Sequence, residues 1–219
     1  VLLGCSPGIR DAAERADRVA SDERLAETIE RDGVAVFLDR WLANPLRVGS
    51  IIPSSSALAQ LVASHIQRGA DDYIVELGAG TGAITRGLLA AGLPEDRLVL
   101  VELDPAMASV LAKQFPGVQM IVGDATKLPE ILPARIHGHI GTVISGLPVL
   151  GRPLEFQQAI VDAAFAVVNP GGPMLQYTYS PISPLPRKRL GLTGKLLGWA
   201  TNNLPPASVW RFTRAEVAA

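Results

Sequence analysis

The 219-residue sequence has little of several residue types on which common protein functions depend. Its single cysteine, Cys5, excludes an internal disulfide and a multi-cysteine metal site, and it fits a reducing compartment. Aromatic residues make up 5% of the chain and the formal net charge is −1, so the composition gives no sign of bulk nucleic-acid binding. No run of about twenty apolar residues occurs, which argues against an integral membrane protein.

Histidine is also scarce, and its three positions do not indicate a metal site. His65 stands alone on a helix expected at residues 57–67, and His137 and His139 have no Cys, Asp or Glu close in sequence. We therefore expect no bound metal. The opening residues 1–8 are apolar but have no basic segment before them, so we do not interpret them as a signal peptide.

What the sequence does have is a glycine-rich stretch at residues 72–82, Asp-Tyr-Ile-Val-Glu-Leu-Gly-Ala-Gly-Thr-Gly. An apolar run at 73–77 leads into it and a helix-like segment follows, which predicts a strand, a turn and a helix. Glycines at alternate positions permit positive φ and a close approach of backbone to ligand, and the helix N-terminus offers unpaired N–H groups. The spacing differs from the G-x-G-x-x-G of dinucleotide sites. We interpret the stretch as a cofactor-binding turn.

Two further acidic residues follow apolar runs that we expect to be the second and third strands. Residues 97–101 lead into Glu102 and residues 118–122 lead into Asp124. Glu102 is positioned to accept hydrogen bonds from both ribose hydroxyls of an adenosine, and Asp124 to bind an adenine amino group. The combination resembles the S-adenosylmethionine site of Rossmann-like class I methyltransferases. The residues expected to hold this cofactor are Ser50, Ile51, Ser55, Glu76, Gly78, Ala79, Gly80, Thr81, Gly82, Glu102, Leu103, Asp124, Ala125 and Ser145.

The remaining pattern fits the same α/β fold. The resemblance implies a seven-stranded, mostly parallel sheet with an antiparallel last strand, preceded by N-terminal amphipathic helices. Beyond the three strands above, we expect strands at 138–147, 174–179, 199–203 and 207–214, and helices at 57–67, 81–91, 129–135 and 154–168.

The N-terminal region, residues 1–43, is expected to form an amphipathic helical extension to a methyltransferase domain at residues 44–219. Residues 11–31 and 34–42 are rich in helix formers, and apolar residues recur near helical spacing. The segment either packs on its own domain as a lid or lies on a bilayer surface. For the second interpretation the membrane-binding residues are Arg24, Leu25, Ile29, Arg31, Phe37 and Trp41.

The end of the strand expected at 138–147 bears on the substrate, because ligands of open parallel sheets bind at the carboxyl ends of the strands. Enzymes that methylate adenine in nucleic acid carry Asn or Asp there, then Pro-Pro or Leu-Pro, then an aromatic residue that stacks on the flipped base. This sequence has Ser145 and Val149 at those two positions. Both differences disfavour a base as the substrate.

The C-terminal quarter supplies other candidate residues. Tyr177 and Tyr179 lie on one face of their expected strand, where a tyrosine is either a core residue or a substrate contact. Three cations follow a proline-rich loop and form either a phosphate-binding site or a solvated loop end: Arg187, Lys188 and Arg189. Residues 181–219 carry six basic residues against one acidic residue, which indicates a local anionic partner.

Several longer motifs resemble the bacterial phospholipid N-methyltransferases, over about residues 20–214. Beside the glycine motif, they are Asn-Pro-Leu-Arg-Val-Gly-Ser-Ile-Ile-Pro-Ser-Ser at 44–55, Ser-Gly-Leu-Pro at 145–148, Tyr-Thr-Tyr-Ser-Pro-Ile-Ser-Pro-Leu at 177–185 and Asn-Leu-Pro-Pro-Ala at 203–207. The resemblance implies methylation of phosphatidylethanolamine to its monomethyl and dimethyl forms, and in some enzymes to phosphatidylcholine. It implies a monomeric cytoplasmic protein, peripheral on the inner membrane and bound to anionic lipid, with no nucleic-acid partner.

In this interpretation the neutral lipid amine attacks the sulfonium methyl group, with Tyr177 and Ser145 as the catalytic candidates. Arg187, Lys188, Arg189 and Tyr179 are the candidates for binding the lipid. Two other classes of function remain open. One is an rRNA adenine dimethyltransferase, which a gel shift with structured RNA would reveal. The other is a non-catalytic S-adenosylmethionine-binding membrane module, which would bind the cofactor without turnover.

Overall fold

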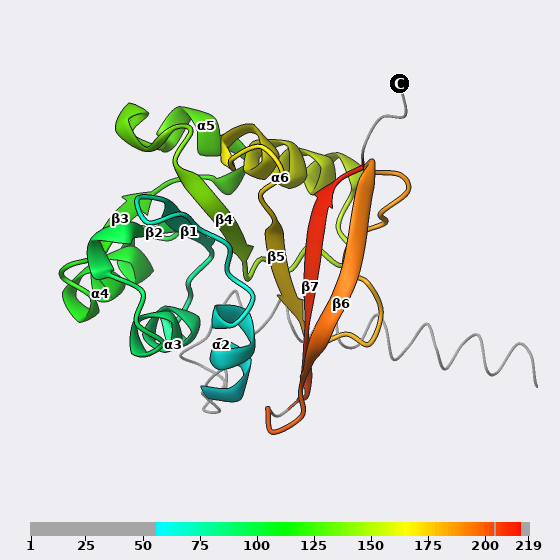
Figure 1. Ribbon diagram of the computed structural model, residues 1–219, viewed down its shortest axis with the longest axis horizontal. Coiled ribbons are helices and arrows are strands. Elements are labelled where there is room, and N and C mark those ends of the chain that lie inside the picture. The colour runs from blue at the N-terminus through cyan, green and yellow to red at the C-terminus, as the bar shows by residue number, and fades with distance from the viewer. Residues whose placement is uncertain (1–55, 204, 216–219) are drawn as a thin grey trace, which may run out of the picture. The chain divides into compact units, whose positions relative to one another are not determined.

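The protein is described by a computed structural model at residues 56–203 and 205–215, and these residues form an α/β unit around one sheet (Figure 1). The strand order is β3-β2-β1-β4-β5-β7-β6, with β1 to β5 parallel and β7 antiparallel to both of its neighbours. This confirms the expected fold class. The strands are β1 (Tyr73–Leu77), β2 (Leu98–Glu102), β3 (Gln119–Val122), β4 (Ile140–Ser145), β5 (Met174–Thr178), β6 (Leu192–Ala200) and β7 (Ala207–Arg214).

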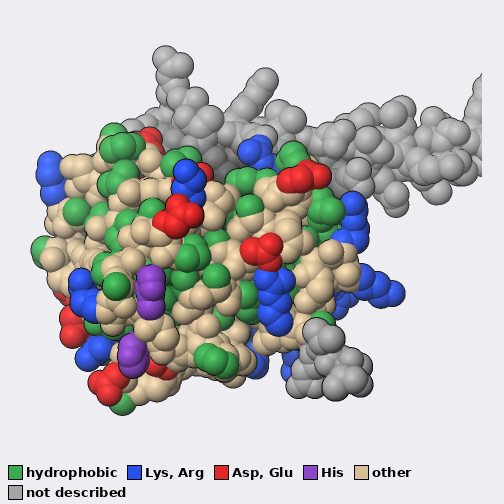
Figure 2. Space-filling view, turned by 90° about the horizontal axis from the view of Figure 1, so that it is seen from above, with side chains coloured by type: hydrophobic (Ala, Val, Ile, Leu, Met, Phe, Trp, Pro, Cys, Tyr) green, Lys and Arg blue, Asp and Glu red, His purple; other side chains and the backbone are tan. Residues whose placement is uncertain are grey.

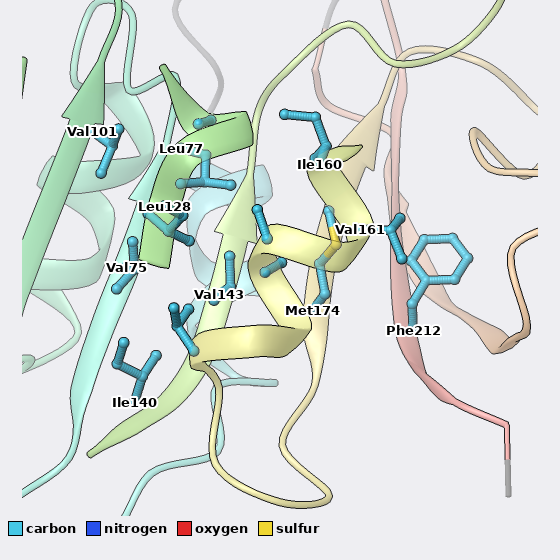
Figure 3. Close-up of a cluster of buried hydrophobic side chains, with 14 of the residues drawn as sticks. Val75, Leu77, Val101, Leu128, Ile140, Val143, Ile160, Val161, Met174 and Phe212 are labelled. Atoms are coloured by element: carbon cyan, nitrogen blue, oxygen red, sulfur yellow. The ribbon is translucent and has the colours of Figure 1, made fainter. Parts of the chain in front are cut away.

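Helices cover both faces of the sheet. The central parallel strands read as nearly continuous apolar runs because both of their faces are buried. Side chains of α2 (Ser56–Ala63), α3 (Ala83–Ala90) and α4 (Pro105–Gln114) pack on one face, and those of α5 (Leu128–Ile131) and α6 (Leu154–Val167) pack on the other. Figure 3 shows the buried side chains on the sheet face that α5 and α6 cover. None of the helices in the described part of the chain has the length and apolarity that crossing a bilayer requires.

Two elements differ from the sequence-based expectation. Helix α4 was not predicted, although Asp104 caps it by accepting hydrogen bonds from the N–H groups of Ala106 (2.8 Å) and Met107 (3.3 Å). The prediction of a strand at 199–203 was wrong, because β6 is Leu192–Ala200 and a turn follows it. Strand β6 contains two glycines and a register shift, so it lacks the regular alternation that marks a strand in sequence.

The connection between β5 and β6 crosses from one end of the sheet to the other, and we call residues 180–190 the strap. At its start, Ser208 Oγ on β7 donates to the carbonyl oxygen of Ser180 at 3.0 Å. Near its end, Arg187 Nη1 donates to the carbonyl oxygen of Gly194 on β6 at 2.8 Å. The strap therefore runs from the carboxyl end of β5 to the edge where the parallel strands begin (Figure 1).

The N-terminal predictions lie outside the described residues. They comprise the extension at 1–43 and three of the expected cofactor residues, Ser50, Ile51 and Ser55. The six expected membrane-binding residues, from Arg24 to Trp41, lie outside as well.

Candidate active site

The turn between β1 and α3 takes the backbone conformation for which its glycines are suited. Gly78, Gly80 and Gly82 have φ angles of 69°, 55° and 72°, in the left-handed region that residues with a Cβ avoid. A Cβ on Gly82 would lie 2.5 Å from Cε2 of Phe115. Among the described residues, a Cβ on Gly80 would meet only the carbonyl oxygen of Gly78, at 4.0 Å. This part of the chain therefore leaves space above Gly80, where a ligand can approach the backbone.

Glu102, at the end of β2, is hydrogen-bonded directly to this turn. Its carboxylate accepts bonds from the N–H groups of Gly80 (3.3 Å), Leu103 (2.9 Å) and Asp104 (3.2 Å). Two apolar side chains beside it face solvent, since Leu103 is 70% exposed and Val122 is 52% exposed. An acidic group flanked by exposed apolar side chains suits a ribose joined to a flat apolar base.

Asp124 follows β3 at the same edge of the sheet. Its Oδ1 accepts a hydrogen bond from the N–H of Thr126 at 2.9 Å, and the side chain is exposed. The neighbouring N–H of Gly123 donates to the carbonyl oxygen of Glu102 at 3.0 Å, which joins the ends of β2 and β3. The structure thus places Glu102 and Asp124 at adjacent strand ends. Ala79 and Ala125 are buried beneath the same edge, so a ligand would meet mainly their backbone.

Glu76 is buried on the β1 face that packs against α3. Thr85 Oγ1 donates to Glu76 Oε2 at 2.8 Å, whereas Oε1 is buried and has no hydrogen-bond partner among the described residues. Burial raises the pKa of Glu76 to about 7; the Thr85 hydrogen bond opposes the shift and the charge of Glu102 adds to it. An unsatisfied oxygen at such a position is where a bound cation or N–H donor would be most stabilising.

Tyr177 reaches from β5 to the ends of β4 and β1. A Cβ on Gly146 would overlap the Tyr177 hydroxyl and would lie 2.7 Å from Cζ of the same ring and 3.1 Å from the carbonyl oxygen of Gly78. The phenol therefore rests on the bare backbone of Gly146, whose N–H donates to the carbonyl oxygen of Leu77 just before the cofactor turn. Burial raises the pKa of Tyr177 well above its usual value, and the charge of Glu76 adds to the effect. At neutral pH the hydroxyl is consequently protonated.

Ser145 is not brought together with Tyr177, although both were predicted as catalytic. Its side chain is fully buried, and its Oγ accepts a hydrogen bond from the N–H of Leu147 at 3.3 Å. It precedes Gly146 by one residue, so it points to the opposite face of the sheet. Val149 is also buried, in the hydrophobic cluster on that opposite face. By contrast, Tyr179 packs against the same cluster as Tyr177 and contributes to the raised pKa of the Tyr177 phenol.

Two buried glutamines that the sequence analysis did not single out hold the 146–152 loop. Gln176 Nε2 donates to the carbonyl oxygen of Leu147 at 3.0 Å, and Gln157 Nε2 donates to that of Val149 at 2.8 Å. In both residues Oε1 is buried and has no partner within the described part of the chain. The available signal was Gln176 itself, a polar residue inside an otherwise apolar strand next to Tyr177.

Arg187, Lys188 and Arg189 are exposed and lie away from Tyr177. Gly194, to which Arg187 is bonded, pairs with Phe212, and Phe212 pairs with Met174. Met174 precedes Tyr177 by three residues, and Gly194 lies two strands away from Met174. The backbone of Gly194 is therefore separated from Tyr177 by about 10 Å along the strands and about 10 Å across them. The three cations are therefore not part of the site at the carboxyl edge.

The open glycine turn, the acidic ends of β2 and β3, and the orphaned oxygen of Glu76 fit an adenosyl cofactor with a cationic amino acid end. A family model described as "Methyltransferase domain" matches residues 74–172. The chain is 30% identical over 178 residues, 80% of its length and 93% of the relative, to the ornithine lipid N-methyltransferase of Singulisphaera acidiphila. It belongs to the class I S-adenosylmethionine-dependent methyltransferases, and its cofactor is S-adenosylmethionine.

Other relatives act on RNA by name. The ribosomal RNA small subunit methyltransferase A of Synechococcus sp. is 33% identical over 129 residues, which span 54% of this chain and 42% of that relative. Among solved structures, TrmN from Thermus thermophilus has a TM-score of 0.51 at 17% identity, covering 73% of this chain and 48% of the other. The 23S rRNA methyltransferase ErmE has a TM-score of 0.50 at 17% identity, covering 71% and 66%. The two structures support the fold alone.

Substituting Gly80→Ala tests the role of the open turn, with Gly92→Ala as the matched control. Both glycines have positive φ and open space for a Cβ, so each substitution should cost about 1 kcal/mol of folding stability. Only Gly80→Ala places a methyl group where the cofactor approaches, and we expect its Kd for S-adenosylmethionine to rise at least tenfold in isothermal titration calorimetry. Equal affinities of the two variants would contradict this assignment.

Substituting Glu76→Gln should change how stability depends on pH. The folded-state pKa of about 7 lies above the ordinary value of 4.5, so the contribution of Glu76 to stability falls as pH rises between these values and then levels off. The neutral amide avoids this loss. Relative to wild type, the variant should therefore gain about 3 kcal/mol in unfolding free energy between pH 4.5 and pH 8.

Urea denaturation of the cofactor-free protein at several pH values would measure this difference, with the exposed Glu155→Gln as the control. A constant difference between Glu76→Gln and wild type across the range would show that the Glu76 carboxyl titrates normally.

Proposed function

We propose that the protein transfers methyl groups to the amino group of a phospholipid, with phosphatidylethanolamine as the acceptor. The products are the monomethyl and dimethyl lipids, and phosphatidylcholine where a third transfer follows. The observation that carries the proposal is the position of Tyr177, whose phenol lies at the carboxyl edge in contact with Gly146 and beside the cofactor turn. A neutral phenol and its aromatic ring suit an amine that becomes a cation during the reaction.

The comparison with the lipid enzyme supports this class of substrate. The match covers 93% of the ornithine lipid N-methyltransferase, whose name describes methylation of a lipid nitrogen. The match to the rRNA enzyme covers 42% of that protein. Similarity over nearly a whole relative supports a shared substrate class more strongly than similarity over a cofactor-binding half.

Catalysis in this proposal comes mainly from positioning of the amine. When bound, S-adenosylmethionine supplies an electrophilic methyl group. The Tyr177 hydroxyl oxygen accepts a hydrogen bond from an N–H of the neutral amine and so fixes the direction of the amine lone pair. Because the pKa of Tyr177 is raised, the phenol does not remove the ammonium proton, and that proton passes to another side chain or to water. The ring face of Tyr177, and that of Tyr179 beside it, stabilise the methylated ammonium product.

Methylation of adenine in rRNA is the second candidate, because several relatives are named as ribosomal RNA small subunit methyltransferases. An aromatic side chain after the Leu-Pro pair would be needed to stack on a flipped base. Here Val149 occupies that position and is buried in the core, so it offers no stacking surface. A gel shift and methyl-transfer assay with structured rRNA fragments would test this alternative directly.

We further propose that residues 1–43 bind the cytoplasmic face of the inner membrane, with the protein acting as a peripheral monomer. The apolar Phe37 and Trp41 would enter the bilayer interface while Arg24 and Arg31 contact anionic headgroups. Replacing Phe37 and Trp41 together by serine should weaken binding to anionic vesicles about tenfold in a flotation assay. Unchanged binding would favour the interpretation of this segment as a lid.

Substituting Tyr177→Phe tests the catalytic assignment. Loss of one hydrogen bond to the amine should lower kcat for labelled methyl transfer to phosphatidylethanolamine vesicles by about 10-fold to 100-fold. The Kd for S-adenosylmethionine should not change. The matched control is Tyr73→Phe, at the opposite end of β1, where the ring packs 5.2 Å from the Arg97 guanidinium.

Unaltered kcat in Tyr177→Phe would remove Tyr177 from the reaction. If wild-type protein bound the cofactor but labelled neither phosphatidylethanolamine nor RNA, the lipid proposal would fail and a non-catalytic binding module would be favoured.

A further inference from the structure

One face of the β6–β7 ribbon carries exposed apolar side chains that the site described above does not use. Leu196 pairs with Trp210 and Trp199 pairs with Ser208, and residues paired across antiparallel strands share a face. Trp210 Nε1 donates to Ser208 Oγ at 3.1 Å, so these two side chains lie on the same side. Leu196 is 38% exposed and Trp199 is 40% exposed. The edge strand therefore presents two large apolar side chains outward.

The strap lies against this same face and adds to it. Ser180, at its start, accepts a hydrogen bond from Ser208, and its Oγ accepts another from the N–H of Ile182 at 3.2 Å. Ile182 is 54% exposed. We call Ile182, Leu196, Trp199 and the three cations Arg187, Lys188 and Arg189 the ribbon surface.

The cations lie on this face at the other end of β6. A Cβ on Gly194 would lie 2.5 Å from Cδ of Arg187 and 2.7 Å from the ring of Phe212, so Arg187 and Phe212 are on one side of the sheet. Phe212 stacks on Trp210 at 6.5 Å between ring centroids. A pocket of about 580 Å³ opens there, lined by Ile182, Leu185 and Leu192 and by all three cations. It combines apolar walls with a cationic rim.

The charge of the region is of one sign. Residues 181–215 contain six Lys or Arg and no Asp or Glu. None of the ion pairs between described residues involves Arg187, Lys188 or Arg189. Figure 2, seen from the end where the parallel strands begin, shows Lys and Arg side chains projecting on the side where β6 lies. Cations without an ion-pair partner among the described residues, beside exposed apolar side chains, suit a partner that is both anionic and apolar.

We propose that the ribbon surface docks on an anionic lipid bilayer, with Ile182, Leu196 and Trp199 in the interface and the three cations at lipid phosphates. A second copy of the chain does not fit, because a two-fold contact would bring the same cations together. Nor do the cations hold the reacting lipid, since its two-carbon link between amine and phosphate cannot span the distance from Tyr177. The inference goes beyond the proposed function and does not depend on which molecule is methylated.

The first test uses vesicles of phosphatidylcholine and phosphatidylglycerol, which lack the primary amine of the proposed acceptor. The variant Lys188→Glu/Arg189→Glu should bind them at least tenfold more weakly than wild type, since each lost cation lowers affinity about fivefold. The loss should diminish at high salt. The control, Lys113→Glu/Arg135→Glu, changes charge equally beside β3 at the opposite edge, where Arg135 is bonded to Gln119. Equal losses in both variants would overturn the proposal.

The second test locates Trp199 directly. In a Trp41→Phe background, brominated lipids in the vesicles should quench tryptophan fluorescence, and a further Trp199→Phe substitution should abolish the quenching because Trp210 is buried. Vesicle-bound protein without quenching of Trp199 would overturn the proposal. So would a concentration-dependent dimer in the absence of lipid that Trp199→Ser abolishes, because a second copy would then cover this face.

Methyl transfer to phosphatidylethanolamine dispersed in detergent separates this inference from the proposed function. We expect Lys188→Glu/Arg189→Glu to retain that activity, together with wild-type affinity for S-adenosylmethionine. Vesicle docking through the ribbon surface without any methyl transfer by wild type would leave the docking inference standing while the lipid-methylation proposal failed.

Discussion

Strands β1 and β4 are each followed by a glycine, and the close approach of these two backbone segments is the constraint on which the site depends. The N–H of Gly146 donates to the carbonyl oxygen of Leu77 at 3.0 Å, and a Cβ on Gly78 would lie 2.7 Å from Leu147. Tyr177 fits over Gly146 only because no side chain is there. The ring of Tyr177 therefore contacts the backbone of Gly146, which is bonded to the residue before the cofactor turn, without any intervening side chain.

The same edge of the sheet holds several buried polar atoms that have no hydrogen-bond partner among the described residues. They are Oε1 of Glu76 on β1, of Gln157 on α6 and of Gln176 on β5. Each lost hydrogen bond lowers folding stability by about 1–3 kcal/mol, and such atoms are uncommon in protein interiors. The amide nitrogens of the two glutamines donate to carbonyl oxygens of the loop that follows β4, so these hydrogen bonds fix the orientation of both side chains. In Glu76 the free oxygen lies beside the turn, where a ligand group can satisfy it.

The elements near the cofactor were predictable from sequence because their signals are local. An apolar run followed by Gly or by Glu102 marks each strand end without reference to distant residues. Helix α4 could have been predicted in the same way, from Asp104 and Pro105 at its start. Strand β6 and the strap could not, because their course is set by pairing with β7, which lies between β5 and β6 in the sheet. That pairing separates Arg187 from Tyr177, whereas proximity in sequence places them near each other.

The position of β7 also relates the two proposals. Because β7 is inserted next to β5, the edge strand β6 runs in the direction of β5, and its last residues return to the carboxyl edge of the sheet. Trp199 pairs with Ser208 and Ser208 pairs with Thr178, the residue after Tyr177. A bilayer in contact with Trp199 would thus lie at the level of the phenol along the strands but on the other face of the sheet, because Trp199 shares the face of Trp210 and Phe212 whereas Tyr177 packs with Val209. A lipid whose acyl chains stay in the membrane would therefore have to extend its headgroup over the carboxyl edge of the sheet to reach Tyr177.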